Sequence, residues 1–339
     1  MNRREFLIST AAAAAVTPVR TGWAQPPKGA KPSTLDRIAI MTLNFDRILK
    51  VPDRQPGPER TLELFDIGQM IADTYGVHRV EFQHYHLAST EPSYFKEMRA
   101  RLEKSKSRAT QINLEFSGLN ISAPQQRDRL LAIDLTKAWI DHAALLGAEK
   151  VMINQGAQGG QNPVMPTHEN KVYSIPTLKT MVDYGKSKGI IVSVETRGGG
   201  GGNRGRGAGA AGAAPGAAGA AQPAAPPPTA PPAAPATPPM PSPEVWALLA
   251  EILKASGARS NVDVGGAAAA NQEELHQCLK MLFPYTANTM HTRVNTRWDL
   301  ATAIRYLEKD LGYKGLYTIE SSGGHEGTKE IYDVVVATV

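Results

Sequence analysis

The sequence has almost no cysteine. Cys278 is the only one in the 339-residue chain, so no disulfide can form within it. A free cysteine usually behaves as a small buried hydrophobe, and Cys278 lies in an amphipathic stretch. We therefore expect it to pack inside a helix and to have no role in chemistry.

The chain also lacks a strong excess of charge. Its formal net charge is only +5, and the lysine and arginine residues are scattered. The densest basic cluster, Arg99–Arg108, is interrupted by Glu103 and by apolar residues, as is usual for a solvated helix face. A nucleic-acid-binding protein normally concentrates its positive charge on one surface. The composition therefore predicts no nucleic-acid partner.

Long hydrophobic runs that could span a membrane are missing as well. The apolar stretch near the N terminus, Ile8–Val16 with its neighbours, is roughly 14 uncharged residues long, whereas a bilayer core needs about 20. It follows the paired arginines of Asn2–Leu7 and precedes the small-x-small site Gly22–Ala24. This pattern predicts a twin-arginine signal peptide at residues 1–24, cleaved after Ala24, and no stable membrane anchor. The mature protein is then expected to be periplasmic or secreted.

Residues 198–243 consist almost entirely of glycine, alanine and proline. Such a segment has too few large apolar side chains to offset the entropy of ordering it. We interpret it as a disordered insertion within a single domain that covers residues 35–339. Without the insertion, roughly 270 residues remain, close to the ~250 typical of one eight-stranded α/β barrel.

Short apolar runs and amphipathic stretches alternate through the rest of the chain. This order predicts a (β/α)8 TIM barrel. Glycines directly after four of the amphipathic stretches indicate where helices end, at Gly76, Gly147, Gly189 and Gly257. The eight expected strands are Arg37–Thr42, His78–Phe82, Gln111–Phe116, Lys150–Asn154, Ile190–Glu195, Asn261–Val264, Thr289–Val294 and Leu316–Glu320. The helices are expected at Leu62–Tyr75, Ser93–Ser107, Arg127–Leu146, Pro176–Lys188, Pro243–Ser256, Gln272–Phe283, Trp298–Leu311 and Thr328–Val336.

Four residues able to bind a metal lie at or near the ends of the last four strands. They are Glu195, Asp263, His291 and Glu320. Because the carboxyl ends of barrel strands converge on one site, these side chains predict a single metal centre. Three carboxylates and one imidazole favour Mn²⁺ or Mg²⁺, with Co²⁺ or Zn²⁺ as alternatives.

Two segments and this spaced quartet resemble the xylose-isomerase-like superfamily of sugar isomerases and epimerases, nearest to its tagatose and psicose 3-epimerase branch. Tyr75–Phe82 resembles the second strand of that family, and Gly312–Glu320 resembles the eighth. The resemblance covers residues 35–339 apart from the insertion. It implies one divalent metal held by the quartet and a small-molecule sugar substrate.

The resemblance also implies the chemistry. In the epimerases two glutamates lie on opposite sides of a carbon next to a carbonyl, where one removes a proton and the other returns it. These catalytic roles correspond here to Glu195 and Glu320. Arg297 lies where the epimerases place an arginine that binds substrate, although an exposed helix residue is an equal alternative. The expected activity is that of an isomerase, epimerase or related lyase on an unphosphorylated sugar or keto-sugar.

The chain departs from the epimerases at two positions. A histidine expected three residues after Asp263 is Gly266, and an acidic residue expected three after His291 is Val294. The first difference keeps open a non-catalytic sugar-binding barrel. An endonuclease IV-type nuclease is a weaker alternative, because that branch needs several histidines at strand ends. Other polar residues near strand ends receive no role in chemistry: Glu81, His84, His86, Glu115, Gln155, His325 and Glu326.

Overall fold

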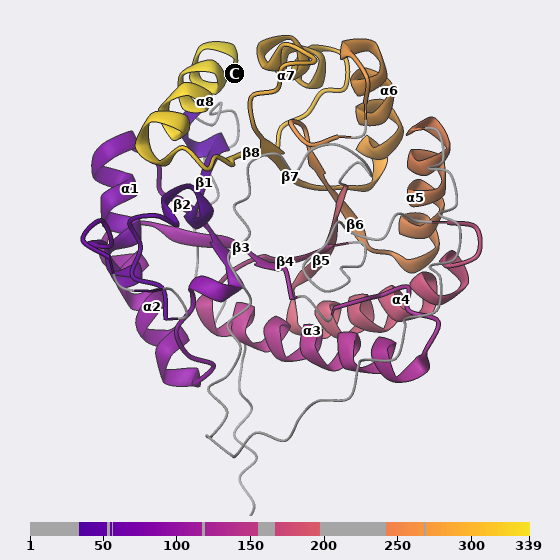
Figure 1. Ribbon diagram of the computed structural model, residues 1–339, viewed down its shortest axis with the longest axis horizontal. Helices are drawn as coiled ribbons and strands as arrows, with labels where there is room; N and C mark the ends of the chain where they lie inside the picture. Colours follow the sequence, from indigo (N-terminus) through magenta and orange to yellow (C-terminus); the bar gives the residue numbers. More distant parts are fainter. Residues whose placement is uncertain are drawn as a thin grey trace, which may run out of the picture. The chain divides into compact units, whose positions relative to one another are not determined.

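Eight parallel strands form a closed barrel in the order β1 to β8, with the helices on its outside (Figure 1). The computed structural model describes residues 34–52, 55, 57–116, 119–154, 167–196, 242–267 and 269–339. The strands are β1 (Ile38–Met41), β2 (Arg79–Gln83), β3 (Arg108–Leu114), β4 (Lys150–Asn154), β5 (Ile191–Thr196), β6 (Arg259–Asp263), β7 (Thr286–Thr292) and β8 (Leu316–Ile319). The predicted TIM barrel is confirmed.

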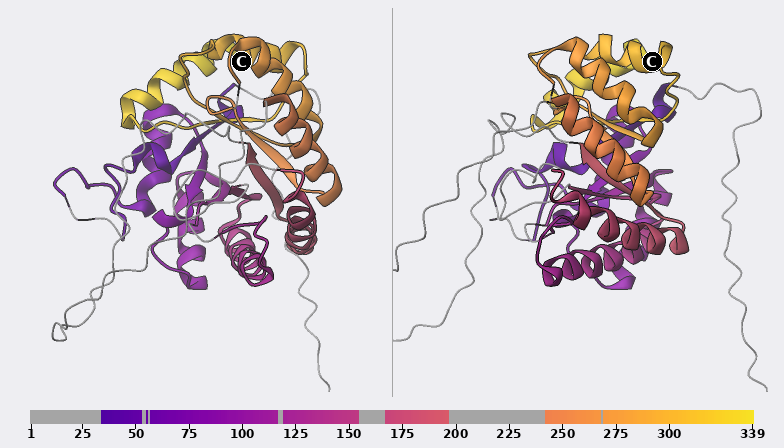
Figure 2. Two further views of the ribbon diagram at one scale, coloured as in Figure 1. Left: turned by 45° about the vertical axis from the view of Figure 1, so that its right-hand side comes forward. Right: turned by 90° about the vertical axis from the view of Figure 1, so that its right-hand side faces the viewer.

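The helices form the outer layer, as the side views of Figure 2 show. They are α1 (Ile67–Tyr75), α2 (Pro92–Lys104), α3 (Gln126–Leu146), α4 (Lys171–Lys188), α5 (Ser242–Ser256), α6 (Gln272–Leu282), α7 (Leu300–Lys309) and α8 (Gly324–Thr338). The glycines expected at helix ends follow α1, α3, α4 and α5 with φ between 65° and 80°. Glycine adopts this left-handed conformation without the steric cost of a Cβ, which explains the sharp helix ends.

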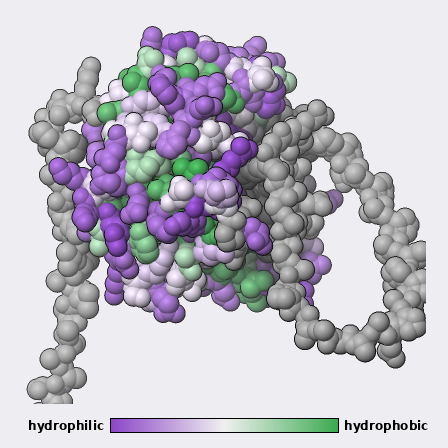
Figure 3. Space-filling model, turned by 60° about the vertical axis from the view of Figure 1, so that its left-hand side comes forward, coloured by the Kyte–Doolittle hydropathy of each residue, from purple (hydrophilic) through white to green (hydrophobic). Residues whose placement is uncertain are grey.

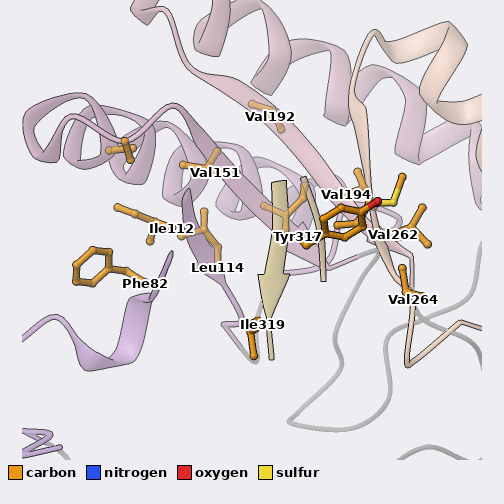
Figure 4. Close-up of a cluster of buried hydrophobic side chains, with 14 of the residues drawn as sticks. Phe82, Ile112, Leu114, Val151, Val192, Val194, Val262, Val264, Tyr317 and Ile319 are labelled. Carbon is orange, nitrogen blue, oxygen red and sulfur yellow. The ribbon is translucent and has the colours of Figure 1, made fainter. Parts of the chain in front are cut away.

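Side chains along each strand point alternately toward the hydrophobic core and toward the barrel interior, where the candidate site lies. On β5, Val192 and Val194 belong to the cluster of buried hydrophobic side chains in Figure 4. Ser193 and Glu195 lie between and after them and therefore face the opposite side of the sheet, the barrel interior. Both are at most 1% exposed. The same period places buried polar residues inside the barrel on β2, β3, β6, β7 and β8.

Some element boundaries differ from the sequence-based expectation. Helix α4 begins at Lys171, so Pro176 lies inside it and does not start it. Proline lacks an N–H and removes one backbone hydrogen bond, but packing of the buried face of α4 (Leu178, Met181 and Val182 among others) supports the helix beyond this point. Helix α8 begins at Gly324, four residues before the expected Thr328.

A largely buried ion pair lies at the amino end of the barrel, remote from the strand carboxyl ends. The guanidinium of Arg37 donates two hydrogen bonds to Glu308, at 2.9 and 2.6 Å, and the Tyr317 hydroxyl donates a third at 2.7 Å. Burial alone would raise the pKa of Glu308, but these donors outweigh it and lower that pKa. Contacts on this face of a TIM barrel serve stability.

The structure also bears on the predictions for Cys278, for membrane-spanning helices and for the N-terminal segment. Cys278 is buried in α6 as expected, and burial raises the pKa of its thiol. None of the described helices is long and apolar enough to cross a membrane. Hydrophilic side chains cover much of the face drawn in Figure 3, with hydrophobic residues scattered among them. The predicted signal peptide, residues 1–24, and residues 198–241 of the insertion lie outside the described residues.

Candidate metal centre

The four residues of the predicted metal site all lie at the carboxyl ends of their strands. Glu195 is the penultimate residue of β5, Asp263 ends β6, His291 is the penultimate residue of β7, and Glu320 directly follows β8. Each is at most 2% exposed. Strand pairing places Asp263 directly beside His291, so the fold brings the quartet to one end of the barrel interior.

Three of the four come together around the imidazole of His291. Its Nδ1 lies 3.2 Å from Glu195 Oε1 and 3.1 Å from Glu320 Oε2. One ligand atom from each of the three residues lies within 4.8 Å of the other two. One imidazole nitrogen and two carboxylates suit a divalent cation. The donor set therefore fits the metal that the sequence predicts.

The electrostatics of this group also favour positive charge. Burial alone would lower the pKa of His291, but Glu81, Glu195 and Glu320 outweigh it and raise that pKa well above its usual value. Three carboxylates packed around one imidazole would otherwise repel one another. A proton on the ring or a cation bound beside it offsets that repulsion.

Asp263 is not part of this group, because it binds Arg293. Arg293 Nε donates to Asp263 Oδ1 at 3.2 Å, and Nη2 of the same guanidinium donates to Oδ2. The Gly266 N–H also donates to Oδ1, at 2.8 Å. Arg293 Nη1 lies 3.6 Å from Glu320 Oε1, so this arginine bridges two of the predicted ligands. Metal binding by Asp263 stays a prediction.

The structure explains why residue 266 is glycine. A Cβ atom at Gly266 would overlap Asp263 Oδ2 and Arg293 Nη2. A Cβ at the preceding Gly265 would lie 2.6 Å from Cβ of Arg293. The two glycines therefore make room for Arg293, whose guanidinium occupies space that a side chain at position 266 would need. At the second position where the chain differs from the epimerases, Val294 lies two residues after β7 and is 46% exposed.

Glu81 and Arg293 are site residues that the sequence reasoning did not assign. Glu81 lies on β2, is fully buried, and places Oε1 only 2.6 Å from His291 Nε2. Arg293 lies two residues after His291 and therefore on the same side of the strand. In the sequence, this two-residue spacing could have indicated that Arg293 faces the same site as His291. For Glu81 the corresponding indication was its place between the apolar residues Val80 and Phe82, which predicts a side chain that points into the barrel.

Arg297, the predicted substrate ligand, is exposed and engaged by nearby backbone. Its Nη1 donates to Ala269 O at 2.6 Å, and Nη2 donates to Ala267 O at 3.3 Å. Its guanidinium carbon also lies 4.4 Å from the centroid of the Trp298 ring. The structure thus holds Arg297 against the loop that follows β6, and contact with a substrate stays a prediction.

Of the remaining polar residues near strand ends, the histidines have local partners. His86 contacts Thr42 Oγ1 at 2.8 Å, and the His325 ring stacks on Tyr75. Glu326 is exposed in the first turn of α8. Gln155 lies outside the described residues. These contacts support structural roles and give no reason to add these residues to the centre.

His84 is buried among the aromatic rings of Tyr85, Phe116 and Trp139 and yields a prediction about pH. Its ring lies 3.8 Å from the Phe116 ring, centroid to centroid, and its Nδ1 is 3.1 Å from the Glu115 N–H, which donates to it. Burial lowers the pKa of His84 to about 4. The folded protein therefore prefers the neutral ring, and this contribution to stability is present above the ordinary pKa of 6.5 and is lost as the pH falls toward 4.

His84→Asn keeps an acceptor near the Nδ1 position and removes the titration. We expect the free energy of unfolding of the wild type, relative to this variant, to fall by up to about 3 kcal/mol between pH 6.5 and pH 4. Urea denaturation of both proteins across that range measures it. Parallel pH profiles would show that His84 does not titrate differently in the folded and unfolded states.

The chain is thus a closed barrel of parallel strands with a Glu–His–Glu group at the carboxyl ends of β5, β7 and β8. Its fold is that of the xylose-isomerase-like TIM barrels. No protein-family model matches the chain, and no curated protein matches it in sequence.

Solved structures with the same fold share little sequence with this chain. A D-tagatose 3-epimerase-like protein is 16% identical, with a TM-score of 0.59, over 89% of this chain and 97% of its own. A 3-keto-D-glucoside 4-epimerase from E. coli is 12% identical, with a TM-score of 0.57, over 89% and 99%. A xylose isomerase-like TIM barrel protein from Mycobacterium smegmatis, in complex with magnesium, is 15% identical, with a TM-score of 0.55, over 90% and 99%.

Proposed function

We propose that this protein is a divalent-metal-dependent epimerase or isomerase, or a related lyase, that moves a proton at a carbon next to the carbonyl of an unphosphorylated sugar or keto-sugar. The observation that carries the proposal is the convergence of Glu195, His291 and Glu320 within 4.8 Å at the carboxyl ends of the barrel strands. A D-tagatose 3-epimerase-like protein, a D-psicose 3-epimerase and a 3-keto-D-glucoside 4-epimerase share the fold, which supports the proposal.

The chemistry needs a base beside the carbon acid and stabilisation of the negative charge that develops on the substrate oxygen. Glu195, His291 and Glu320 would hold the cation, which supplies that stabilisation when bound. Asp263, the fourth predicted ligand, would have to give up a contact with Arg293 to join them. Glu195 and Glu320 come from β5 and from the end of β8, and their carboxylates meet the imidazole within 3.2 Å. In the proposed reaction one of these glutamates takes the proton and the other returns one.

The charge of the centre favours a neutral substrate. The buried carboxylates are those of Glu81, Glu195, Asp263 and Glu320, and the basic groups that contact them are His291 and Arg293. A divalent cation would bring this set near neutrality, whereas a phosphate group would add negative charge beside the carboxylates. This balance supports an unphosphorylated sugar. It also agrees with the proposed export from the cytoplasm, where phosphorylated sugars are concentrated.

The test is a screen of neutral ketoses and 3-keto-glycosides with metal-loaded and chelator-treated protein. We expect stoichiometric binding of one Mn²⁺, Mg²⁺, Co²⁺ or Zn²⁺ and conversion of at least one sugar to an epimer or isomer, seen by NMR. Conversion should stop after chelation and return with added metal. A protein that binds metal and sugars but converts none of them would be a binding barrel, and one that binds no metal would contradict the proposal entirely.

A further inference from the structure

Glu81 reaches the proposed centre from the opposite part of the barrel. It lies on β2, whereas His291 lies on β7, and in the closed barrel β8 and β1 separate the two strands. The Glu81 side chain is fully buried, yet its Oε1 lies 2.6 Å from His291 Nε2. Burying a carboxylate is costly unless it is paired or hydrogen-bonded, so this contact is a defined interaction across the interior.

The contact determines which ring nitrogen carries hydrogen. An ionised carboxylate can only accept a hydrogen bond, so His291 Nε2 must carry the hydrogen that Glu81 accepts. In the neutral imidazole, Nδ1 then presents its lone pair toward Glu195 and Glu320. Asn261 Nδ2 lies 3.0 Å from the same Nε2. Both nitrogens would then be donors, so Asn261 Nδ2 donates to Met152 Sδ, 2.9 Å away, and not to the ring.

A chain of buried amides holds Glu81 in place. Gln111 Nε2 donates to Asn113 Oδ1 at 2.9 Å, and Asn113 Nδ2 donates to Glu81 Oε1 at 2.7 Å. All three residues are fully buried on β2 and β3. The bonds run in one direction and end on the atom that contacts His291. Each step therefore supports the same orientation of the imidazole.

Packing alone does not explain a glutamate at this position. Glu81 Oε2 is buried and has no hydrogen-bond partner among the described residues. Leaving a buried acceptor unsatisfied costs about 1–3 kcal/mol, and more for a charged group. Gln83 Oε1 on the same strand also lacks a partner within the described part of the chain, so the feature that distinguishes Glu81 is a charged carboxylate whose other oxygen contacts His291 Nε2 at 2.6 Å.

We propose that Glu81 is a positioning residue of the metal centre: it fixes His291 as the Nε2–H tautomer and aims Nδ1 at the cation held with Glu195 and Glu320. This inference rests on the proposed metal-dependent function. Outer carboxylates that accept a hydrogen bond from a ligating histidine orient the ring and raise its basicity, and their loss typically weakens metal binding 10- to 100-fold.

The experiment measures Mn²⁺ binding by calorimetry in the full chain and in three variants. Glu81→Leu removes the acceptor and the charge, and we expect the dissociation constant to rise 10- to 100-fold. Glu81→Gln keeps an oxygen acceptor without the charge, so its dissociation constant should be intermediate. Gln83→Leu is the matched control. Gln83 is also buried, lies on the same face of β2 and makes no contact with His291 among its described hydrogen bonds, so affinity should stay near wild type.

A second readout follows the tautomer itself. In protein with ¹⁵N-labelled histidine and bound Zn²⁺, His291 should show a protonated Nε2 and a metal-bound Nδ1, and Glu81→Leu should lose this pattern. If Glu81→Leu does not fold, Glu81→Gln carries the test. Wild-type Mn²⁺ affinity in the folded Glu81 variants would overturn this inference alone. A wild-type protein that binds no divalent ion would overturn it together with the proposed function.

Discussion

Glu320→Gln should lower turnover by about 10²- to 10⁴-fold even at saturating metal, which is the range that general base catalysis contributes. Glutamine keeps the shape of the side chain and one oxygen donor, but it cannot accept the substrate proton. The buried Glu320 carboxylate lies 3.1 Å from His291 Nδ1, so the substitution should also weaken metal binding, though less than it lowers turnover. The measurement is kcat over a metal titration.

A matched control separates this effect from a general change of charge. Glu326→Gln alters an exposed glutamate a few residues further on, in the first turn of α8, and should leave kcat near wild type. If excess metal restores Glu320→Gln to wild-type turnover, Glu320 is only a ligand. Its proposed proton-transfer role would then be wrong.

His291→Ala should mainly weaken metal binding, whereas Glu320→Gln should mainly lower turnover. The substitution removes the imidazole at the centre of the group, so metal occupancy should fall first, and activity should return in part with excess metal. It also leaves Glu81, Glu195 and Glu320 buried without their shared partner. Uncompensated buried charges are strongly destabilising, so we expect the free energy of unfolding to fall by about 3–5 kcal/mol without metal.

We would measure the loss of metal occupancy by mass spectrometry and by calorimetric Mn²⁺ binding. We would measure the loss of stability by urea denaturation. The distinguishing comparison is activity at saturating metal. His291→Ala should recover partly, whereas Glu320→Gln should not. The reverse outcome would show that the ligand and proton-transfer roles assigned here are wrong.

The barrel and the position of the predicted ligands follow from local patterns. Strands such as β4 and β8 are short apolar runs between amphipathic helices, and the left-handed glycines after α1 and α3 end those helices sharply. Glu195 and Asp263 come at the carboxyl ends of their strands, where barrel topology brings ligands together. The hydrophobic periodicity and the order of strands and helices along the chain were sufficient to predict these features.

Contacts between side chains of different strands could not be predicted in the same way. The pairing of Asp263 with Arg293 depends on the small volume of Gly265 and Gly266, which only becomes meaningful once β6 and β7 lie side by side. Glu81 meets His291 across the barrel interior, at a separation of 210 residues in the sequence. No local periodicity encodes either contact, because each depends on the diameter and register of the closed barrel.

Helix starts were less predictable than helix ends for a related reason. Pro176 is a common signal for a helix start, yet α4 begins five residues earlier, at Lys171. Thr167 and Asn170 exchange side-chain to backbone hydrogen bonds of 2.8 and 3.1 Å just before that start. This local turn, together with packing of the helix on the barrel, outweighs the missing N–H of the proline.

The central claim is a metal-dependent proton transfer at a carbon next to a carbonyl, and solvent deuterium tests it most directly. The metal-loaded protein is incubated in D₂O with the sugar that it converts, and the product is examined by NMR. We predict one deuterium at the carbon whose configuration or oxidation level changes, with no uptake after chelation or in Glu320→Gln. Product formed in D₂O without deuterium at that carbon would contradict the account.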